Sequence, residues 1–168
     1  IKKYAEGNQH LAMRLKTTGE AYLDFVYTLP RKDYMLSFGM KANAMNTVMP
    51  AGTNFLEMQW LSKIRQQEKG RKFEDRYSSL NYKYVADDVE NLSESKDDDK
   101  KLPNKVKWIA FMDQFFSSII IADDAFTSTT LSSKLESEQS VYLKTYNSEI
   151  AVAFDPTGKT ATNFKMFY

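Results

Sequence analysis

Few side chains in this sequence are of the types that carry out chemistry, and their spacing does not match that of a known kind of catalytic site. The one histidine, His10, lies near the start of the chain, where an exposed surface position is the simplest interpretation. An acid–base reaction on a sugar would need a histidine together with a carboxylate. Ser117 and Ser118 have no histidine partner that could activate either hydroxyl as a nucleophile. We therefore expect no catalytic residue and no enzyme.

Acidic residues are the next candidates. Asp123 and Asp124 could form a pair of catalytic carboxylates. Adjacent residues of a strand point to opposite faces, however, so a role at a turn or strand end is the better interpretation. The charged run SESKDDDKK (93–101) lacks the spaced acidic residues and the central glycine of a calcium loop. With no cysteine, no metal-ligand spacing and no glycine-rich phosphate loop, the sequence predicts no metal site and no cofactor site.

Aromatic side chains are the remaining candidates, because they could line a peptide or sugar cleft. Packing in a hydrophobic core is the interpretation that we favour for them. Exposed strand edges are a different kind of site, since an extended partner chain can pair with them. Which surface binds is left open by the sequence. The candidate aromatic residues are Trp60, Tyr82, Tyr84, Trp108 and Phe115.

Length and composition indicate one globular domain. The 168 residues are 42% hydrophobic and 27% charged, which is ordinary for such a domain. The 11 Phe and 10 Tyr favour strands, because aromatic rings pack well on a pleated surface. The net charge is +1, so no nucleic-acid partner is expected. The chain shows no internal repeat and no linker, and we expect a single domain over residues 1–168.

Alternating apolar and polar residues predict strands in the first half of the chain. In AYLDFVYTL (21–29), one face carries only apolar side chains, as expected of a half-buried strand. Turn signals at 18–20 and at 29–34 separate this run from its neighbours, which predicts an antiparallel meander of three strands. On this pattern strands are expected at 11–17, 21–29, 35–45 and, where a helical period also fits, 54–64.

The second half mixes strand signals with solvated segments. The charged run at 65–79 predicts a loop or a short helix. Residues 93–101 have no apolar side chain and predict a mobile charged loop. The runs at 81–88, 140–154 and 161–168 read as strands, and DPTG (155–158) reads as a turn. Together these patterns predict an all-β fold, an antiparallel β-sandwich with few short helices.

The stretch KVKWIAFMDQFFSSIIIADDAF (105–126) is the most apolar part of the sequence. Its apolar run of 15 residues is shorter than the roughly 20 that a transmembrane helix needs, and Asp113 interrupts it at a cost of about 2.5–3.5 kcal/mol on insertion scales. Helical spacing and strand-forming composition are evenly matched within it. One solution is two short buried strands at 106–112 and 117–122, joined by a tight corner at Asp113 and Gln114.

The same stretch carries a family resemblance. KWIAFMDQFFSSIIIAD resembles a segment in the periplasmic domain of the YidC-family membrane-protein insertases, of the Bacteroidetes type. RYSSLNYKYVADDVENL, YLDFVYTLPRKDYMLSFGMKA and the terminal NFKMFY are similar to further segments of that domain, in the same order. The resemblance covers about residues 11–168. It departs from the family pattern after the isoleucine run, where Ala122 and Asp123 stand in place of a proline, so a different turn geometry is expected there.

The resemblance implies a β-supersandwich, distantly similar to galactose mutarotase, and decides the 105–126 stretch in favour of two strands. It implies that residues 1–168 are a fragment of a larger periplasmic domain. A membrane anchor is then expected before Ile1 and a five-helix membrane core after Tyr168.

The function implied by the resemblance is that of a non-catalytic domain on the periplasmic side of the bacterial inner membrane. Its implied partners are Sec translocon accessory proteins and nascent membrane proteins. The resemblance implies that the domain itself is soluble, whereas the parent chain is embedded in the membrane. A carbohydrate-binding or carbohydrate-active β-sandwich is the alternative function, and it predicts convergent aromatics with a buried acid.

Overall fold

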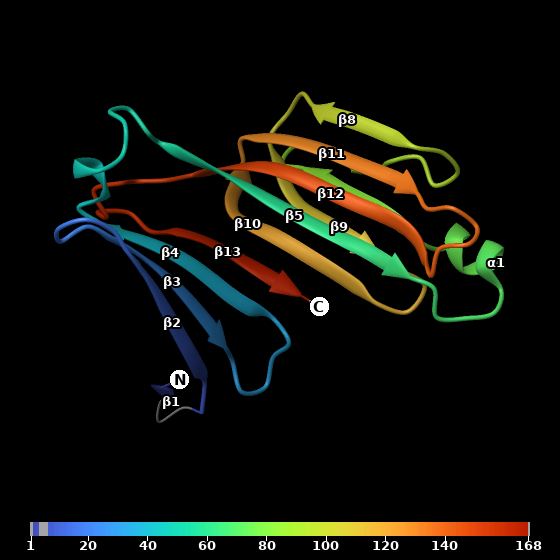
Figure 1. Ribbon diagram of the computed structural model, residues 1–168, viewed down its shortest axis with the longest axis horizontal. Coiled ribbons are helices and arrows are strands. Elements are labelled where there is room, and N and C mark those ends of the chain that lie inside the picture. Colours follow the sequence, from blue (N-terminus) through green and yellow to red (C-terminus); the bar gives the residue numbers. More distant parts are fainter. Residues whose placement is uncertain (1, 4–6, 168) are drawn as a thin grey trace.

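The computed structural model describes residues 2–3 and 7–167, and its strands form two antiparallel sheets that pack together (Figure 1). This arrangement confirms the predicted all-β sandwich. The short helices of the described chain are a 3-10 helix, η1 (Met45–Thr47), and an α-helix, α1 (Arg71–Arg76). No helix in this part of the chain is long and apolar enough to cross a membrane.

In each sheet, neighbouring strands are hydrogen-bonded and antiparallel. The larger sheet has nine described strands, in the order β1 (Lys2–Lys3), β2 (Gln9–Lys16), β3 (Tyr22–Leu29), β4 (Leu36–Asn43), β13 (Thr162–Phe167), β10 (Ser117–Phe126), β9 (Val106–Met112), β6 (Ser79–Tyr84) and β7 (Val89–Asn91). The smaller sheet has four, in the order β5 (Phe55–Arg65), β12 (Tyr142–Ala153), β11 (Ser128–Leu135) and β8 (Asp98–Leu102).

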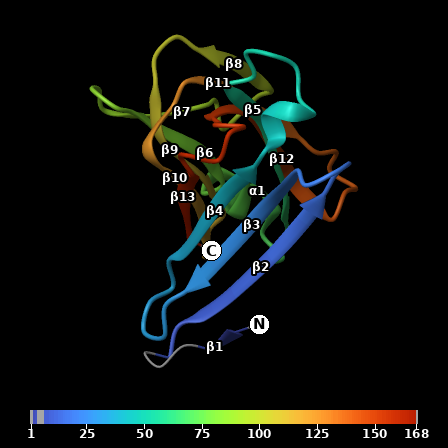
Figure 2. The ribbon, with the colours of Figure 1, turned by 90° about the vertical axis from the view of Figure 1, so that its left-hand side faces the viewer.

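The predicted meander is present as strands β2, β3 and β4. We call these three strands the wing, because they extend away from the four-stranded sheet (Figure 2). Strand β13 lies between β4 and β10 and is hydrogen-bonded to both. The wing is therefore joined to β10 and the strands beyond it only through β13, the last strand of the described chain.

The apolar stretch at 105–126 forms two strands, β9 and β10, as the resemblance implies. Its tight corner is held by Asp113, whose carboxylate accepts hydrogen bonds from the backbone N–H groups of Phe115 (2.7 Å) and Phe116 (2.6 Å). Strand β10 does not stop at residue 122, however. It continues to Phe126 through a register shift against β9, so the expected turn after the isoleucine run is a bulge within a longer strand.

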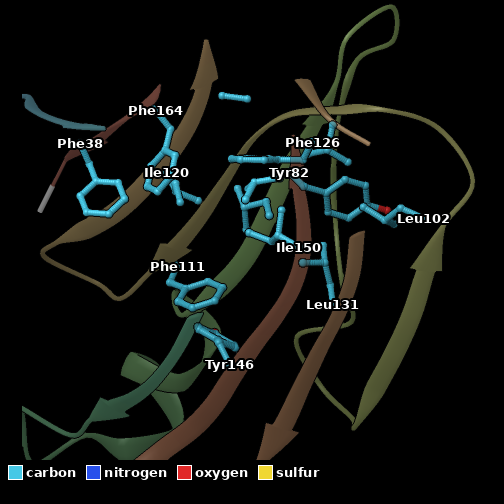
Figure 3. Packing of buried hydrophobic residues seen from close by; sticks show 14 of the residues in the cluster. Phe38, Tyr82, Leu102, Phe111, Ile120, Phe126, Leu131, Tyr146, Ile150 and Phe164 are labelled. Carbon is cyan, nitrogen blue, oxygen red and sulfur yellow. The ribbon is translucent and has the colours of Figure 1, made fainter. Parts of the chain in front are cut away.

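The core lies between the two sheets and is filled by large apolar side chains from both (Figure 3). Trp60 of β5 stacks on Phe111 of β9, with ring centroids 4.1 Å apart, and Phe111 also contacts Tyr146 of β12 at 5.4 Å. Leu131 and Ile150 of the smaller sheet are almost completely buried beside them. Burying this surface is the main source of stability in such a sandwich.

Four strands were not expected from the sequence: β1, β7, β8 and β11. The inward face of β11 consists of Thr129, Leu131 and Ser133. Small hydroxyl side chains therefore occupy buried positions there, and a search for alternating apolar residues passes over them. The expected mobile loop at 93–101 is wrong in its second half, because residues 98–101 belong to β8 and pair with β11.

The predicted turn at 155–158 is present and closes with a hydrogen bond from the Gly158 N–H to the Asp155 carbonyl (3.1 Å). The carboxylate of Asp155 also accepts bonds from Thr157 and Thr160. Gly158 has a φ of +80°, and its Cα approaches the backbone of Ala42 so closely that a Cβ would overlap the Ala42 carbonyl oxygen. This turn thus needs glycine both for its conformation and for space.

Candidate functional site

The wing presents apolar side chains to solvent. Leu11, Met13 and Leu15 of β2 are 39%, 47% and 53% exposed. Their cross-strand partners on β3 are Tyr27, Phe25 and Leu23, which lie on the same face and pack against the core. We call the apolar side formed by Leu11, Met13, Leu15, Phe25 and Tyr27 the wing face.

Aromatic contacts connect the wing face to the core. Tyr27 and Phe25 contact Phe38 of β4 with ring centroids 4.7 and 6.2 Å apart, and Phe38 contacts Phe164 of β13 at 4.7 Å. The inner face of the larger sheet therefore remains apolar from the covered part out to β2. Contiguous apolar surface of this kind typically marks a site of interaction.

The opposite side of the wing is polar. Arg14 of β2 donates two hydrogen bonds to the carboxylate of its cross-strand partner Asp24, at 2.6 and 2.7 Å. Its guanidinium also lies 3.6 Å from the centre of the Tyr22 ring. The bond from Arg14 lowers the pKa of the Asp24 carboxyl below its ordinary value. The polar side of the wing is therefore suited to contact with water. The apolar wing face is the side on which a packing partner is missing.

The edge of β2 is also open over most of its length. In the described chain, β1 pairs only with Gln9 and His10. Residues 11–16 thus have β3 on one side and no described strand on the other. Unpaired N–H and C=O groups on an edge strand can receive an additional strand. The wing offers both a backbone edge and an apolar face to an extended chain.

The side chains that the sequence marked for chemistry are dispersed. His10 is not an exposed surface residue: it is half-buried in β2, and its Nδ1 shares a hydrogen bond of 2.9 Å with the Thr28 hydroxyl. Ser117 and Ser118 are half-buried residues at the start of β10. Within the described chain, no group of histidines and carboxylates could hold a metal ion.

Asp123 and Asp124 lie in the bulge of β10, not at a strand end. Both are exposed, and the Lys107 ammonium donates to their backbone carbonyls at 2.8 and 3.2 Å. They border a mostly apolar cavity of about 340 Å³ at the ends of β10, β12 and β13. Asp155 is the third acid that lines this cavity, and its carboxylate accepts hydrogen bonds from Thr157 and Thr160 in its own turn.

The five candidate aromatics do not form a cleft. Tyr82 and Tyr84 are buried in the core, Trp60 stacks on Phe111, and Phe115 is exposed at a turn. None of the five lines the cavity beside Asp123 and Asp124 or any of three further cavities in the described chain. Their arrangement supports the core interpretation for Trp60, Tyr82 and Tyr84, and gives no sugar-binding platform.

Tyr82 is part of a polar cluster that joins the two sheets. Its hydroxyl donates to the Glu90 carboxylate (2.6 Å), and the Lys100 ammonium donates to the Tyr82 oxygen (2.6 Å) and to Glu90 (2.9 Å). Burial raises the pKa of the Tyr82 phenol, with a further contribution from Glu90. Since Tyr82 and Glu90 belong to the larger sheet and Lys100 to β8, the cluster ties the edges of the sandwich together.

Helix α1 is fixed by three charged side chains that were not singled out from the sequence. The Arg71 guanidinium donates to the carbonyls of residues 136, 137, 140 and 142. The buried carboxylate of Glu74 accepts from the N–H groups of Gln67 and Glu68. Buried Lys144 donates to two carbonyls at the end of the helix. Both carboxylate oxygens of Glu74 accept hydrogen bonds from backbone N–H groups, so this buried acid is not available to a ligand.

Comparison with known proteins gives a consistent result. The family model described as the YidC periplasmic domain matches residues 2–168. A protein of Parabacteroides distasonis named membrane protein insertase YidC is 49% identical over 156 residues. Proteins with the same name from Bacteroides fragilis and Porphyromonas gingivalis are 44% and 34% identical over 158 and 159 residues.

These alignments cover 93–94% of the chain but only 24–26% of each of the three relatives. The chain therefore spans about a quarter of the length of the curated relatives that it matches.

Proposed function

This chain belongs to the YidC periplasmic-domain family, and from that membership we propose that it is a non-catalytic interaction domain of an inner-membrane protein insertase. In this proposal it lies on the periplasmic side of the membrane, as part of a multi-pass protein. Its partners are segments of inserting membrane proteins and Sec translocon accessory proteins. The names of the relatives support the insertase context.

The observation that carries the interaction role is the wing face together with the open edge of β2. Leu11, Met13 and Leu15 are exposed on one side, and residues 11–16 have unpaired backbone groups along the edge. An extended apolar segment adding to β2 would gain backbone hydrogen bonds from the edge and side-chain contacts from the face. Segments of membrane proteins before insertion have this apolar chemistry, which is why we assign the wing to client segments.

A second proposal starts from the same observation. The resemblance implies a larger periplasmic domain, of which residues 1–168 are a part. A further layer of that domain, outside these residues, would then pack on the wing face and complete the sandwich. Under this proposal, interactions with clients or Sec-associated proteins occur elsewhere on the domain.

The carbohydrate-binding alternative has no comparable observation. It requires convergent aromatics and a free buried acid. The candidate aromatics lie in different places, and the oxygens of Glu74, the buried carboxylate of the described chain, are bonded to backbone N–H groups.

Site-specific photocrosslinking in the full-length insertase separates the two proposals. A photoreactive phenylalanine analogue is placed at Met13, or at the exposed Gln59 on the outer face of β5 as a control. Membranes carrying each variant are then irradiated during insertion of a radiolabelled client. The client role predicts client adducts at position 13 and none at position 59. Adducts at position 13 that join only two parts of the insertase itself would reject the client role and support a completed sandwich.

A matched pair of variants tests whether the apolar side chains matter. Leu11→Ser with Leu15→Ser should reduce client adducts at position 13. Leu61→Ser, on the outer face and 54% exposed, should leave them unchanged. Equal adduct yields from all three proteins would mean that the wing face does not hold the client.

A further inference from the structure

Exposed aromatic residues are concentrated at one end of the molecule. Six aromatic side chains of the described chain are more than half exposed. Five of them lie in the turn between β3 and β4, in or directly after α1, and in the turn between β9 and β10. The sixth, Phe55, begins β5. The five are Tyr34, Phe73, Tyr77, Phe115 and Phe116, and we call them the aromatic rim.

The strand registers show that the rim is one continuous edge of the sandwich. Leu36, the first residue of β4, is opposite Met166, and Phe167 is opposite Ile119. Ser117 is opposite Met112, which in turn is opposite Ser79, two residues after Tyr77. Figure 1 shows the same line, from the turn after β3 past the end of β13 to α1. Phe55 lies at the other end, because β5 runs from Phe55 toward α1.

The rim side chains are presented on rigid supports. Phe115 and Phe116 stand on the turn that the Asp113 carboxylate closes. Phe73 and Tyr77 contact each other with ring centroids 4.9 Å apart, on a helix that Arg71 ties to the β11–β12 connection. A surface that is already ordered loses little conformational freedom when it binds.

Basic side chains accompany the aromatic ones. Exposed Arg31 and Lys32 precede Tyr34 in its turn, and exposed Lys72 and Arg76 flank the rings on α1. Asp33 in the β3–β4 turn and Asp113 in the β9–β10 turn each accept hydrogen bonds from backbone N–H groups of their own turns. Aromatic rings beside lysine and arginine are the combination that sits at the headgroup level of a bilayer with anionic lipids.

We propose that the aromatic rim rests against the headgroup region of an anionic lipid bilayer. The phenyl rings of Phe115 and Phe116 enter the boundary between headgroups and acyl chains, and the basic side chains of α1 and of the β3–β4 turn contact lipid phosphates. This inference rests on the proposed function, which places the domain beside the membrane of its own insertase. It orients the domain with the rim toward the lipid and the start of β5 away from it.

The test uses the full-length insertase reconstituted in vesicles of phosphatidylethanolamine and phosphatidylglycerol. Nitroxide labels are placed on Phe116→Cys or, as the control, on Phe55→Cys, in a protein whose other cysteines are serine. Collision rates with oxygen, which concentrates in lipid, and with a water-soluble nickel chelate are compared. We expect oxygen to dominate at position 116 and the nickel chelate at position 55. If the nickel chelate dominates at both positions, or position 116 is shielded from both reagents by protein, the proposal is overturned.

Charge variants test the lipid contact separately. Lys72→Glu with Arg76→Glu should lower the oxygen preference of the label at position 116, and replacing phosphatidylglycerol by phosphatidylcholine should do the same. Lys41→Glu with Lys101→Glu, on exposed strand positions away from the rim, should leave it unchanged. If neither the charge variant nor the change of lipid alters the oxygen preference at position 116, the basic side chains do not contribute to the lipid contact. The outcome is independent of client adducts at position 13, so failure of the lipid contact and failure of the client role are distinguishable.

Discussion

The ammonium group of Lys144 lies 2.7 Å from the carbonyl oxygen of Ser78. Lys144 lies near the start of β12, an inner strand of the smaller sheet, and Ser78 lies between α1 and β6 of the larger sheet. The same ammonium donates to the Asp75 carbonyl at 2.9 Å and lies 3.4 Å from the Asp75 carboxylate. Burial lowers the pKa of Lys144, but these acceptors surround its charge. One buried lysine thus connects the smaller sheet to α1 and to the residue that leads into β6.

Replacing Lys144 should destabilise the domain strongly. Lys144→Ala leaves two carbonyls without their hydrogen-bond donor and the Asp75 carboxylate without its ion-pair partner, and we expect a loss of about 3–5 kcal/mol in the free energy of unfolding. Lys144→Met keeps the packing of the side chain and should lose less. Urea denaturation measures both. Exposed Lys134→Ala is the control and should change the free energy by less than about 0.5 kcal/mol; a similar small change for Lys144→Ala would contradict the role of its contacts.

Two glycines with positive φ should respond differently to alanine. Gly19, at φ +68°, has open space where a Cβ would be, so Gly19→Ala should cost only the left-handed strain, roughly 1–2 kcal/mol. Gly158 has similar strain plus the overlap with the Ala42 backbone. Gly158→Ala should therefore lower the thermal midpoint well beyond Gly19→Ala or prevent folding. Equal midpoints for the two variants would show that the turn can move away from β4.

Two leucines in the smaller sheet provide a test of the core. Leu131 is fully buried between the sheets, whereas Leu61 is on the outer face. Leu131→Ala should cost about 2–5 kcal/mol through lost burial and the cavity that remains. Leu61→Ala should stay within about 0.5 kcal/mol. Denaturant unfolding compares them, and a cost at Leu61 as large as that at Leu131 would indicate that the outer face is covered.

The ion pair on the wing should make stability depend on pH. Because Arg14 lowers the pKa of Asp24 in the folded state, the pair stabilises the fold at pH values above the unfolded value of about 3.8. This contribution is lost as the pH falls through the lower folded pKa. Asp24→Asn removes it, so the difference in unfolding free energy from the unchanged protein should be about 1 kcal/mol or less at neutral pH and should disappear once the pH is low enough to protonate Asp24 in the folded state. A difference that does not vary with pH would contradict this assignment.

Strands with apolar alternation could be predicted from the sequence, and β2, β3, β4 and β12 appear where the pattern places them. For residues 105–126, the helical spacing of the apolar residues and the strand-forming composition were evenly matched. Only the family resemblance favoured strands. Strand β11 was not predicted, because its inward-facing residues Thr129 and Ser133 carry hydroxyl groups and do not give an apolar alternation.

The candidate site was harder to predict for a physical reason. The alternation of Leu11, Met13 and Leu15 indicates a strand with one apolar face, but whether a second sheet covers that face depends on the topology of the whole domain. Arg71, Glu74 and Lys144 were missed because charged side chains are normally solvated, and only the fold shows the carbonyl and amide groups that surround them.

The position of β13 has a consequence for how the chain folds as it is synthesised. The wing precedes strands β5 to β13 in the sequence, yet its only neighbour in the sheet that is distant in sequence is β13, the last strand of the described chain. Strands β2, β3 and β4 can pair with one another early, but they cannot join the rest of the larger sheet until residues 162–167 are also available to pair. Contacts that join such distant parts of a sequence form slowly. The domain is therefore expected to spend its synthesis as two separate partly folded pieces, exposed to chaperones, and to become one body only with its final strand.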